Sequence, residues 1–138
     1  MTAVHLSANT IKATSTFVER VAAAYQTQQA ILFGSRARGT AHDESDADVA
    51  IILKGKPGHF IKTKMAMNDI AYDILLDTGI RIQPLPVWEG EWAHTERYSN
   101  PHLLHNIALE GIALCLYPRP PVSQPQHGSY GPLCKRLD

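Results

Sequence analysis

Two aspartates separated by one residue, Asp46 and Asp48, are the side chains in this sequence best placed to do chemistry. They begin an apolar run over residues 49–53 that predicts a buried strand, in which alternate side chains point to the same face about 7 Å apart. Two carboxylates at that spacing repel each other by about 2 kcal/mol at an effective dielectric constant near 20. A divalent cation removes this repulsion, so the pair predicts a Mg²⁺ site.

A turn of small residues precedes the acidic pair. Residues 30–33 predict another buried strand, and Gly34 and Ser35 stand where that strand ends. Such a turn leaves backbone N–H groups free to bind a phosphate, and the Ser35 hydroxyl adds a donor. Metal-binding acids beside a phosphate-binding turn are what a nucleoside triphosphate with Mg²⁺ requires.

Two arginines follow the turn, and both are candidates for binding the nucleotide. Arg36 and Arg38 carry guanidinium groups that can donate charge-assisted hydrogen bonds to triphosphate oxygens. The alternative is that they are solvated, or that they pair with Asp43 and Glu44.

The arrangement of Gly34 and Ser35, then ten residues, then Asp46-Ala47-Asp48 resembles the signature of the DNA polymerase β-like nucleotidyltransferases. The short chain and the sequence Gly-Ser-Arg-Ala-Arg-Gly are similar to the minimal nucleotidyltransferase (MNT) branch, often the antitoxin half of HEPN/MNT toxin–antitoxin pairs. The resemblance implies that an acceptor hydroxyl attacks the α-phosphate of a bound nucleotide. Asp46 and Asp48 would then hold two Mg²⁺ ions, and Gly34 and Ser35 would bind the β- and γ-phosphates.

The family pattern has a third carboxylate on the next core strand, and here we expect Gln83 at that position. A glutamine amide can ligate Mg²⁺, but it carries no charge and cannot take a proton. Three interpretations stay open. Glu89 or Glu91 reaches into the site, the second ion is weakly held, or the protein binds nucleotide without turning it over.

Apolar periodicity and capping residues predict helices over residues 7–25, 60–78 and 101–110 and strands over 30–33, 46–53, 80–83 and 112–117. The third strand must end or lie at an edge, because Pro84 and Pro86 cannot donate to a ladder. On the second helix we expect a common apolar side formed by Ile61, Met65, Ile70, Ile74 and Leu75. These elements indicate one α/β domain over residues 1–117, a nucleotidyltransferase-like mixed β-sheet packed with helices on one side. Residues 118–138 are rich in proline and predict an extended or disordered tail.

Three acidic residues on the second predicted helix form a stripe. Asp69, Asp73 and Asp77 recur every four residues, which is more typical of a solvated helix face than of a metal site.

Pairs of histidines and tryptophans offer competing sites. His102 and His105 share a face of the last predicted helix, where a transition metal is conceivable, but no third ligand follows in sequence and a packing role is favoured. Trp88 and Trp92 are able to stack on an adenine, although packing in the core or at an interface is the commoner role.

Composition limits the possible partners and compartment. Acidic and basic residues balance at 13 each, so no general affinity for nucleic acid or for an anionic membrane is implied. Cys115 and Cys134 lack zinc-site spacing, which favours a reduced, cytoplasmic setting. Residues 1–9 lack the features of a secretory signal, and no apolar run is long enough to span a membrane.

By resemblance to the MNT branch, the leading hypothesis is an antitoxin that transfers AMP from ATP to a tyrosine of a cognate HEPN ribonuclease toxin. Little of the chain remains for a substrate domain, so we expect the acceptor to come from this partner, in a hetero-oligomer. One alternative is a nucleotidyltransferase that modifies a small molecule such as an aminoglycoside. The other, favoured by Gln83, is a catalytically silent module that neutralises its toxin by occlusion.

Overall fold

A computed structural model describes residues 7–38 and 46–114 of the chain. The helices and strands follow in the order α1 (Ala8–Ala24), β1 (Thr27–Phe33), α2 (Ser35–Arg38), β2 (Ala47–Leu53), α3 (Phe60–Thr78), β3 (Ile82–Trp88), α4 (Glu89–Ala93), a 3-10 turn (Thr95–Arg97), α5 (Pro101–Glu110) and β4 (Ile112–Leu114). The mixed α/β organisation predicted from the sequence is confirmed. The predicted tail over residues 118–138 lies outside the described residues, as do residues 115–117 of the predicted last strand.

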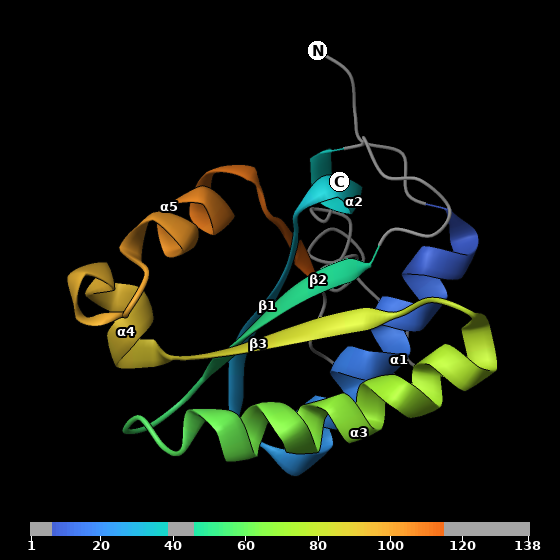
Figure 1. The fold of residues 1–138 in the computed structure, drawn as a ribbon, viewed down its shortest axis with the longest axis horizontal. Coiled ribbons are helices and arrows are strands. Elements are labelled where there is room, and N and C mark those ends of the chain that lie inside the picture. The colour runs from blue at the N-terminus through green and yellow to red at the C-terminus, as the bar shows by residue number, and fades with distance from the viewer. Residues whose placement is uncertain (1–6, 39–45, 115–138) are drawn as a thin grey trace, which may run out of the picture.

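The four described strands form one mixed sheet in the order β3-β2-β1-β4 (Figure 1). β1 pairs antiparallel with β2 and with β4, whereas β2 and β3 are parallel and joined by the crossover helix α3. The register places Phe33 opposite Asp48 and Asp48 opposite Gln83. Asp48 therefore lies in the middle of three strands, at the end where β1 finishes and β2 and β3 begin.

β3 is longer than the sequence predicted, and it occupies a sheet edge. It continues through Pro84 and Pro86, both of them buried, to Trp88. An edge strand tolerates proline because the missing N–H would have faced away from the neighbouring strand. The outward carbonyl of Pro84 accepts a hydrogen bond from Lys64 Nζ on α3 at 2.6 Å, so this part of the edge is covered.

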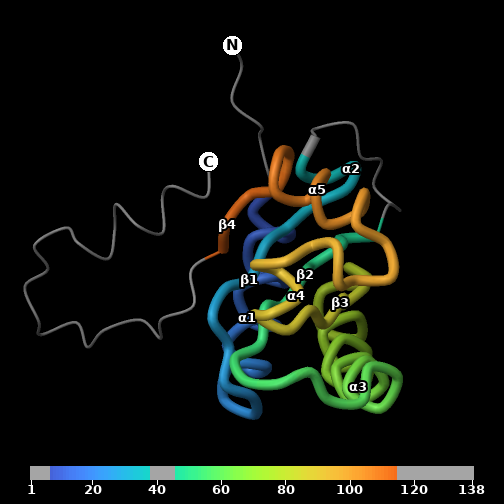
Figure 2. The backbone as a smooth tube through the Cα atoms, turned by 90° about the vertical axis from the view of Figure 1, so that its left-hand side faces the viewer, coloured from blue at the N-terminus to red at the C-terminus, as the bar shows by residue number. Residues whose placement is uncertain are grey.

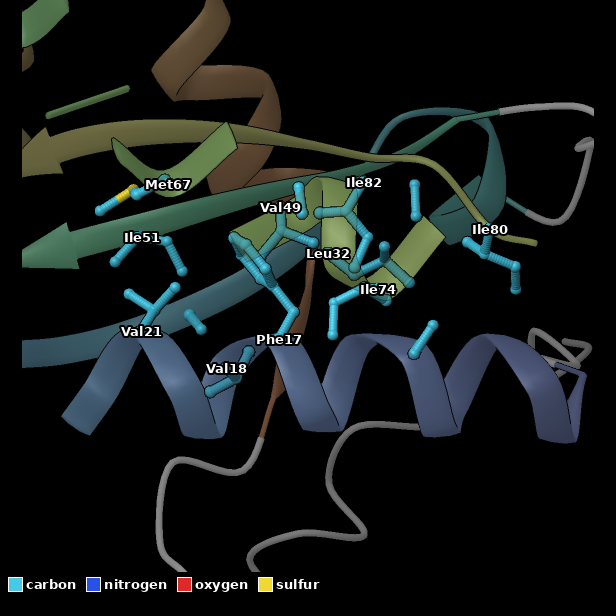
Figure 3. Close-up of a cluster of buried hydrophobic side chains, with 14 of the residues drawn as sticks. Phe17, Val18, Val21, Leu32, Val49, Ile51, Met67, Ile74, Ile80 and Ile82 are labelled. Carbon is cyan, nitrogen blue, oxygen red and sulfur yellow. The ribbon is translucent and has the colours of Figure 1, made fainter. Parts of the chain in front are cut away.

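Both faces of the sheet are covered by helices, as Figures 1 and 3 show. One face packs on α1 and α3 through a cluster that includes Phe17, Val49 and Ile51. The other packs on α5 through a cluster that includes Ile52 and Leu104. The expectation that helices lie on one side only was wrong. The physical reason is that β2 is apolar on both of its faces, as a strand buried from both sides must be.

α3 has the predicted bounds, and Gly79 ends it in the left-handed conformation with φ 80°. Its buried residues are Met67, Ala71 and Ile74. The predicted apolar side is only partly correct, because the side chains of Ile61 and Met65 are 56% and 61% exposed. α3 therefore carries apolar residues on two faces, and only one of them packs against the sheet and α1.

The capping residues fit the sequence pattern. Ser7 caps α1 by accepting a hydrogen bond from the Thr10 N–H, and Asn100 caps α5 ahead of Pro101 in its first turn. Within the described residues, no helix is both long enough and apolar enough to cross a membrane.

Candidate nucleotide and metal site

Three of the predicted side chains converge at the start of β2 and β3. Asp48 and Gln83 are register partners on parallel strands, so their side chains point to the same face of the sheet. Asp46 lies directly before β2, and its Oδ2 atom accepts a hydrogen bond from Gln83 Nε2 at 3.2 Å. The structure therefore brings Asp46, Asp48 and Gln83 together, on the face of the sheet that α5 also covers.

Gly34 makes room for Asp48. Its φ of 79° is a left-handed conformation that favours glycine, and a Cβ atom at this position would collide with Asp48 Oδ2. The turn after β1 and the acidic strand β2 are thus in direct contact. This close approach is a physical reason for glycine here, and it links the two halves of the predicted motif.

Ser35 begins the short helix α2 immediately after Gly34. The N–H groups at the start of a helix have no partner within that helix, which is why anions commonly bind at helix N-termini. Ser35 is partly exposed, and its position beside Gly34 places these donors next to Asp48. The geometry is compatible with the phosphate-binding role predicted for Gly34 and Ser35.

The two arginines of α2 differ in what the structure describes. Arg36 Nη1 donates a hydrogen bond to Thr10 Oγ1 at 3.0 Å, near the start of α1. At least part of the Arg36 guanidinium therefore fixes α2 to α1. The side chain of Arg38 lies outside the described residues, as do Asp43 and Glu44, so the predicted phosphate contact of Arg38 stays a prediction.

Arg81 is a site residue that the sequence interpretation missed. Its Nε atom lies 3.8 Å from Asp46 Oδ1, and its backbone carbonyl accepts the N–H of Ala47. Asp46 therefore faces two donor groups, the Arg81 guanidinium on one oxygen and the Gln83 amide on the other. The signal was present in the sequence, because Arg81 and Gln83 alternate with Ile80 and Ile82 and so belong to one face.

Glu89 and Glu91 do not supply the third carboxylate. Glu89 Oε2 accepts the N–H of Gly55 at 2.6 Å, and Glu91 Oε1 accepts the N–H of Trp88 at 3.0 Å. Both acids follow the far end of β3, and Glu89, the nearer in sequence, is six residues or about 20 Å beyond Gln83 at 3.3 Å per residue. Of the three interpretations left open by the sequence, the one in which Glu89 or Glu91 reaches into the site was wrong, because β3 continues past its prolines.

Lys64 adds a positive charge close to the acids. Burial lowers the pKa of Lys64 below its ordinary value, and the nearby Asp48 carboxylate partly opposes that shift. The ammonium group is anchored on the Pro84 carbonyl. Lys64 thus contributes to the electrostatic field around Asp48 from the neighbouring edge of the sheet.

The competing sites have structural explanations. Trp88 is buried in the core and Trp92 packs against the cluster under α5. His102 and His105 are exposed, as are Asp69, Asp73 and Asp77. In the described part of the chain, no group of three or more His, Cys, Asp or Glu side chains is placed to hold a metal ion.

The donor set at Asp46 and Asp48 fits a divalent cation of the Mg²⁺ type. Carboxylate and amide oxygens are hard ligands, and Asp46 is 40% exposed, which leaves access for water and phosphate oxygens. Asp46, Asp48 and the Gln83 amide are the residues that would hold it. With two carboxylates and one neutral amide, the set is one negative charge short of the three-carboxylate pattern.

Known proteins resemble parts of this chain. The profile of the family described as "Polymerase beta, Nucleotidyltransferase" matches residues 18–85. A Methanocaldococcus jannaschii protein named "Putative protein adenylyltransferase" is 42% identical over 57 residues. That match covers 41% of this chain and 39% of the relative's length. A Sulfolobus solfataricus crystal structure described as "a putative nucleotidyltransferase" is 23% identical, with a TM-score of 0.49 and coverage of 75% of this chain and 78% of that one.

The matched residues 18–85 include Gly34, Ser35, Asp46, Asp48 and Gln83, the residues that the structure gathers at one end of the sheet. Over these residues, just under half of its length, the chain matches the polymerase β family of nucleotidyltransferases.

Proposed function

We propose that the chain is a protein adenylyltransferase of the MNT type, which transfers AMP from ATP to a tyrosine of a cognate HEPN ribonuclease toxin and so acts as its antitoxin. The observation that carries the proposal is the contact between Gly34 and Asp48, which joins the turn predicted to bind phosphate to the acidic strand, within the segment that matches the nucleotidyltransferase family. The name of the Methanocaldococcus relative supports protein as the acceptor class.

In this reaction the tyrosine hydroxyl oxygen attacks the α-phosphorus of ATP. A new phosphorus–oxygen bond to tyrosine forms, the bond between the α-phosphorus and the bridging oxygen breaks, and pyrophosphate leaves. A bound Mg²⁺ would neutralise triphosphate charge and lower the pKa of the acceptor hydroxyl. The backbone donors at Gly34 and Ser35 would hold the β- and γ-phosphates, which keeps the leaving group in line. The released proton passes to water or to an aspartate, since Gln83 cannot take it.

The second candidate function is a catalytically silent antitoxin that binds nucleotide and neutralises its toxin by occlusion. One observation favours it. Gln83, which we predicted at the position of the family's third carboxylate, donates its amide to Asp46 and adds no acidic charge to the site.

The test uses ATP labelled at the α-phosphate, Mg²⁺ and the product of the adjacent gene, which the proposal expects to be the HEPN protein. The expected result is label on the HEPN protein, lost in Asp46→Asn and Asp48→Asn and kept in Glu19→Gln, an exposed acid on α1. ATP labelled at the γ-phosphate should transfer nothing. Tight complex formation without label, unchanged in both aspartate variants, would establish the silent antitoxin instead. Label on kanamycin but on no protein would establish a small-molecule enzyme.

A further inference from the structure

Arg81 has a fixed backbone and a loosely held side chain. It lies directly before β3, and its carbonyl accepts the N–H of Ala47 at 2.8 Å, which ties the backbone to the residue next to Asp46. The side chain is 61% exposed, and its Nε atom lies 3.8 Å from Asp46 Oδ1. That separation is an ion pair and not a hydrogen bond, because N–H···O hydrogen bonds span about 2.7–3.2 Å. The Arg81 guanidinium can therefore turn away from Asp46 without disturbing the sheet.

Both carboxylate oxygens of Asp46 face donor groups. Gln83 Nε2 donates to Oδ2 at 3.2 Å, and the Arg81 guanidinium faces Oδ1. These are the oxygens that a Mg²⁺ ion would ligate, and a guanidinium is a cation that competes for the same negative charge. Asp46 is 40% exposed, so an ion can approach it from solvent. To bind there, the ion must displace the Arg81 guanidinium from Oδ1.

The second acid also has a cation near it. Burial lowers the pKa of Lys64 and the Asp48 charge partly opposes this shift, so the two groups interact. Lys64 projects from α3, which runs alongside β3 in Figures 1 and 2, and its ammonium is held by the Pro84 carbonyl at 2.6 Å. Arg81 beside Asp46 and Lys64 near Asp48 thus offset the charge of the acidic pair. A free divalent cation gains less at such a site than at two unpaired carboxylates.

A nucleoside triphosphate changes this balance, because it brings negative charge to the cations. The strand order places the Gly34 turn on one side of the acids, at the end of β1, and Arg81 on the other side, before β3. A triphosphate that lies on the turn and reaches the acids therefore extends towards Arg81. A guanidinium has five N–H donors and binds phosphate oxygens in pairs, which makes phosphate a stronger partner for it than a carboxylate at 3.8 Å.

We infer that Arg81 holds Asp46 while the site is without substrate and turns to a phosphate group when a nucleotide binds, so that the metal ion enters with the nucleotide and not before it. Arg81 is then a positioning residue for Asp46 and a binding residue for the nucleotide. This role of Arg81 rests on the proposed function, because it requires that the site binds a nucleotide together with its metal ion.

The test measures two affinities of the full chain and compares Arg81→Gln with the original protein. Electron paramagnetic resonance should show free Mn²⁺ bound about two- to fivefold more tightly by Arg81→Gln, since an exposed ion pair of this size no longer competes for Asp46. Isothermal titration calorimetry at saturating Mn²⁺ should show ATP bound about tenfold more weakly, because a charge-assisted contact is lost. Structural damage would weaken both affinities, so the opposite signs identify the proposed role.

Two control variants accompany Arg81→Gln. Arg20→Gln removes an exposed arginine that pairs with Asp73 at 3.1 Å from α1, on the opposite face of the sheet, and should change either affinity by less than about twofold. Arg81→Lys keeps a positive charge beside Asp46 and should leave the affinity for free Mn²⁺ within about twofold of the original value.

The variant Asp46→Asn separates this inference from the proposed function. If Asp46→Asn weakens Mn²⁺ binding but Arg81→Gln does not strengthen it, Arg81 does not compete with the ion, and the inference is overturned while the site stands. Unchanged ATP binding in Arg81→Gln overturns it as well. If Asp46→Asn leaves Mn²⁺ binding unchanged, the acidic pair does not hold the ion, and the inference and the proposed function both fail.

Discussion

Gln83 donates a hydrogen bond from its side-chain amide to the carboxylate of Asp46, with Nε2 and Oδ2 3.2 Å apart. An amide therefore bonds to Asp46 at the position where we predicted the third acid of the family pattern from the sequence. The Arg81 guanidinium lies near the other Asp46 oxygen. The site therefore combines the carboxylates of Asp46 and Asp48 with the Gln83 amide and the Arg81 guanidinium, both of which face Asp46.

Gln83→Asp should tighten divalent-cation binding, because it adds a negative charge and removes the amide donor to Asp46. Titration of Mn²⁺ followed by electron paramagnetic resonance should show at least one ion bound more tightly than in the original protein. Any weak transfer activity should rise with it. Gln83→Asn is the control, since it keeps a neutral amide. Unchanged Mn²⁺ binding in Gln83→Asp would place the third ligand elsewhere.

Gly34→Ala should destabilise the fold and weaken nucleotide binding. The left-handed backbone alone costs a non-glycine residue about 1–2 kcal/mol, and the new Cβ would also displace the Asp48 carboxylate. Gly55→Ala is the matched control, because Gly55 has φ 94° and a Cβ added there would meet no atom within 4 Å. Urea denaturation should show the larger loss for Gly34→Ala. Equal losses in the two variants would mean that Asp48 is not held against the turn.

Lys64→Met should change how stability depends on pH. Because burial lowers the Lys64 pKa in the folded protein below 10.5, the unfolded chain binds more protons between the two pKa values. The Lys64 contribution to the free energy of unfolding therefore rises as the pH increases through that interval. Urea denaturation at stepped pH should show the original protein gaining stability relative to Lys64→Met towards pH 10.5. Lys62→Met controls for loss of a charge from α3, and parallel curves for the original protein and Lys64→Met would contradict the prediction.

Leu104→Ala tests the second covered face of the sheet. Leu104 on α5 is fully buried against Ile52 and its neighbours, so truncation should lower the free energy of unfolding by about 2–5 kcal/mol. Leu109→Ala removes an exposed leucine from the same helix and should change it by no more than about 0.5 kcal/mol. A small effect of Leu104→Ala would show that α5 is not part of the core.

The convergence of Gly34, Asp46 and Asp48 could be predicted because the signals for it are local in sequence. Gly34 and Asp48 belong to one motif, and strand alternation puts Asp46 and Asp48 on one face. The bounds of α3 could also be predicted from local signals, the helical period of its apolar residues and Gly79 at its C-terminal end. The structure places Gln83 in register with Asp48, at the position expected on the next strand.

The features that were missed depend on tertiary arrangement. Which side of α3 is buried could not be read from its period, because apolar residues occupy two faces and only packing chooses between them. Whether Glu89 reaches the acidic site depends on how far β3 continues beyond Gln83. β3 continues through Pro84 only because it lies at an edge of the sheet. Arg81 was found only once the register had placed it beside Asp46. The sequence did contain a signal that helices cover both faces of the sheet, because β2 has apolar residues at both odd and even positions.

The most direct measurement is binding of ATP with Mn²⁺ to the full chain, followed by electron paramagnetic resonance without any partner protein. The acidic pair and the turn should together bind the complex, so the original protein and Glu19→Gln should bind it equally well. Asp46→Asn and Asp48→Asn should each weaken binding by about tenfold or more, the size expected when a charged group in direct contact is lost. Equal binding by all four proteins would contradict the proposal that these aspartates hold the nucleotide's metal ion.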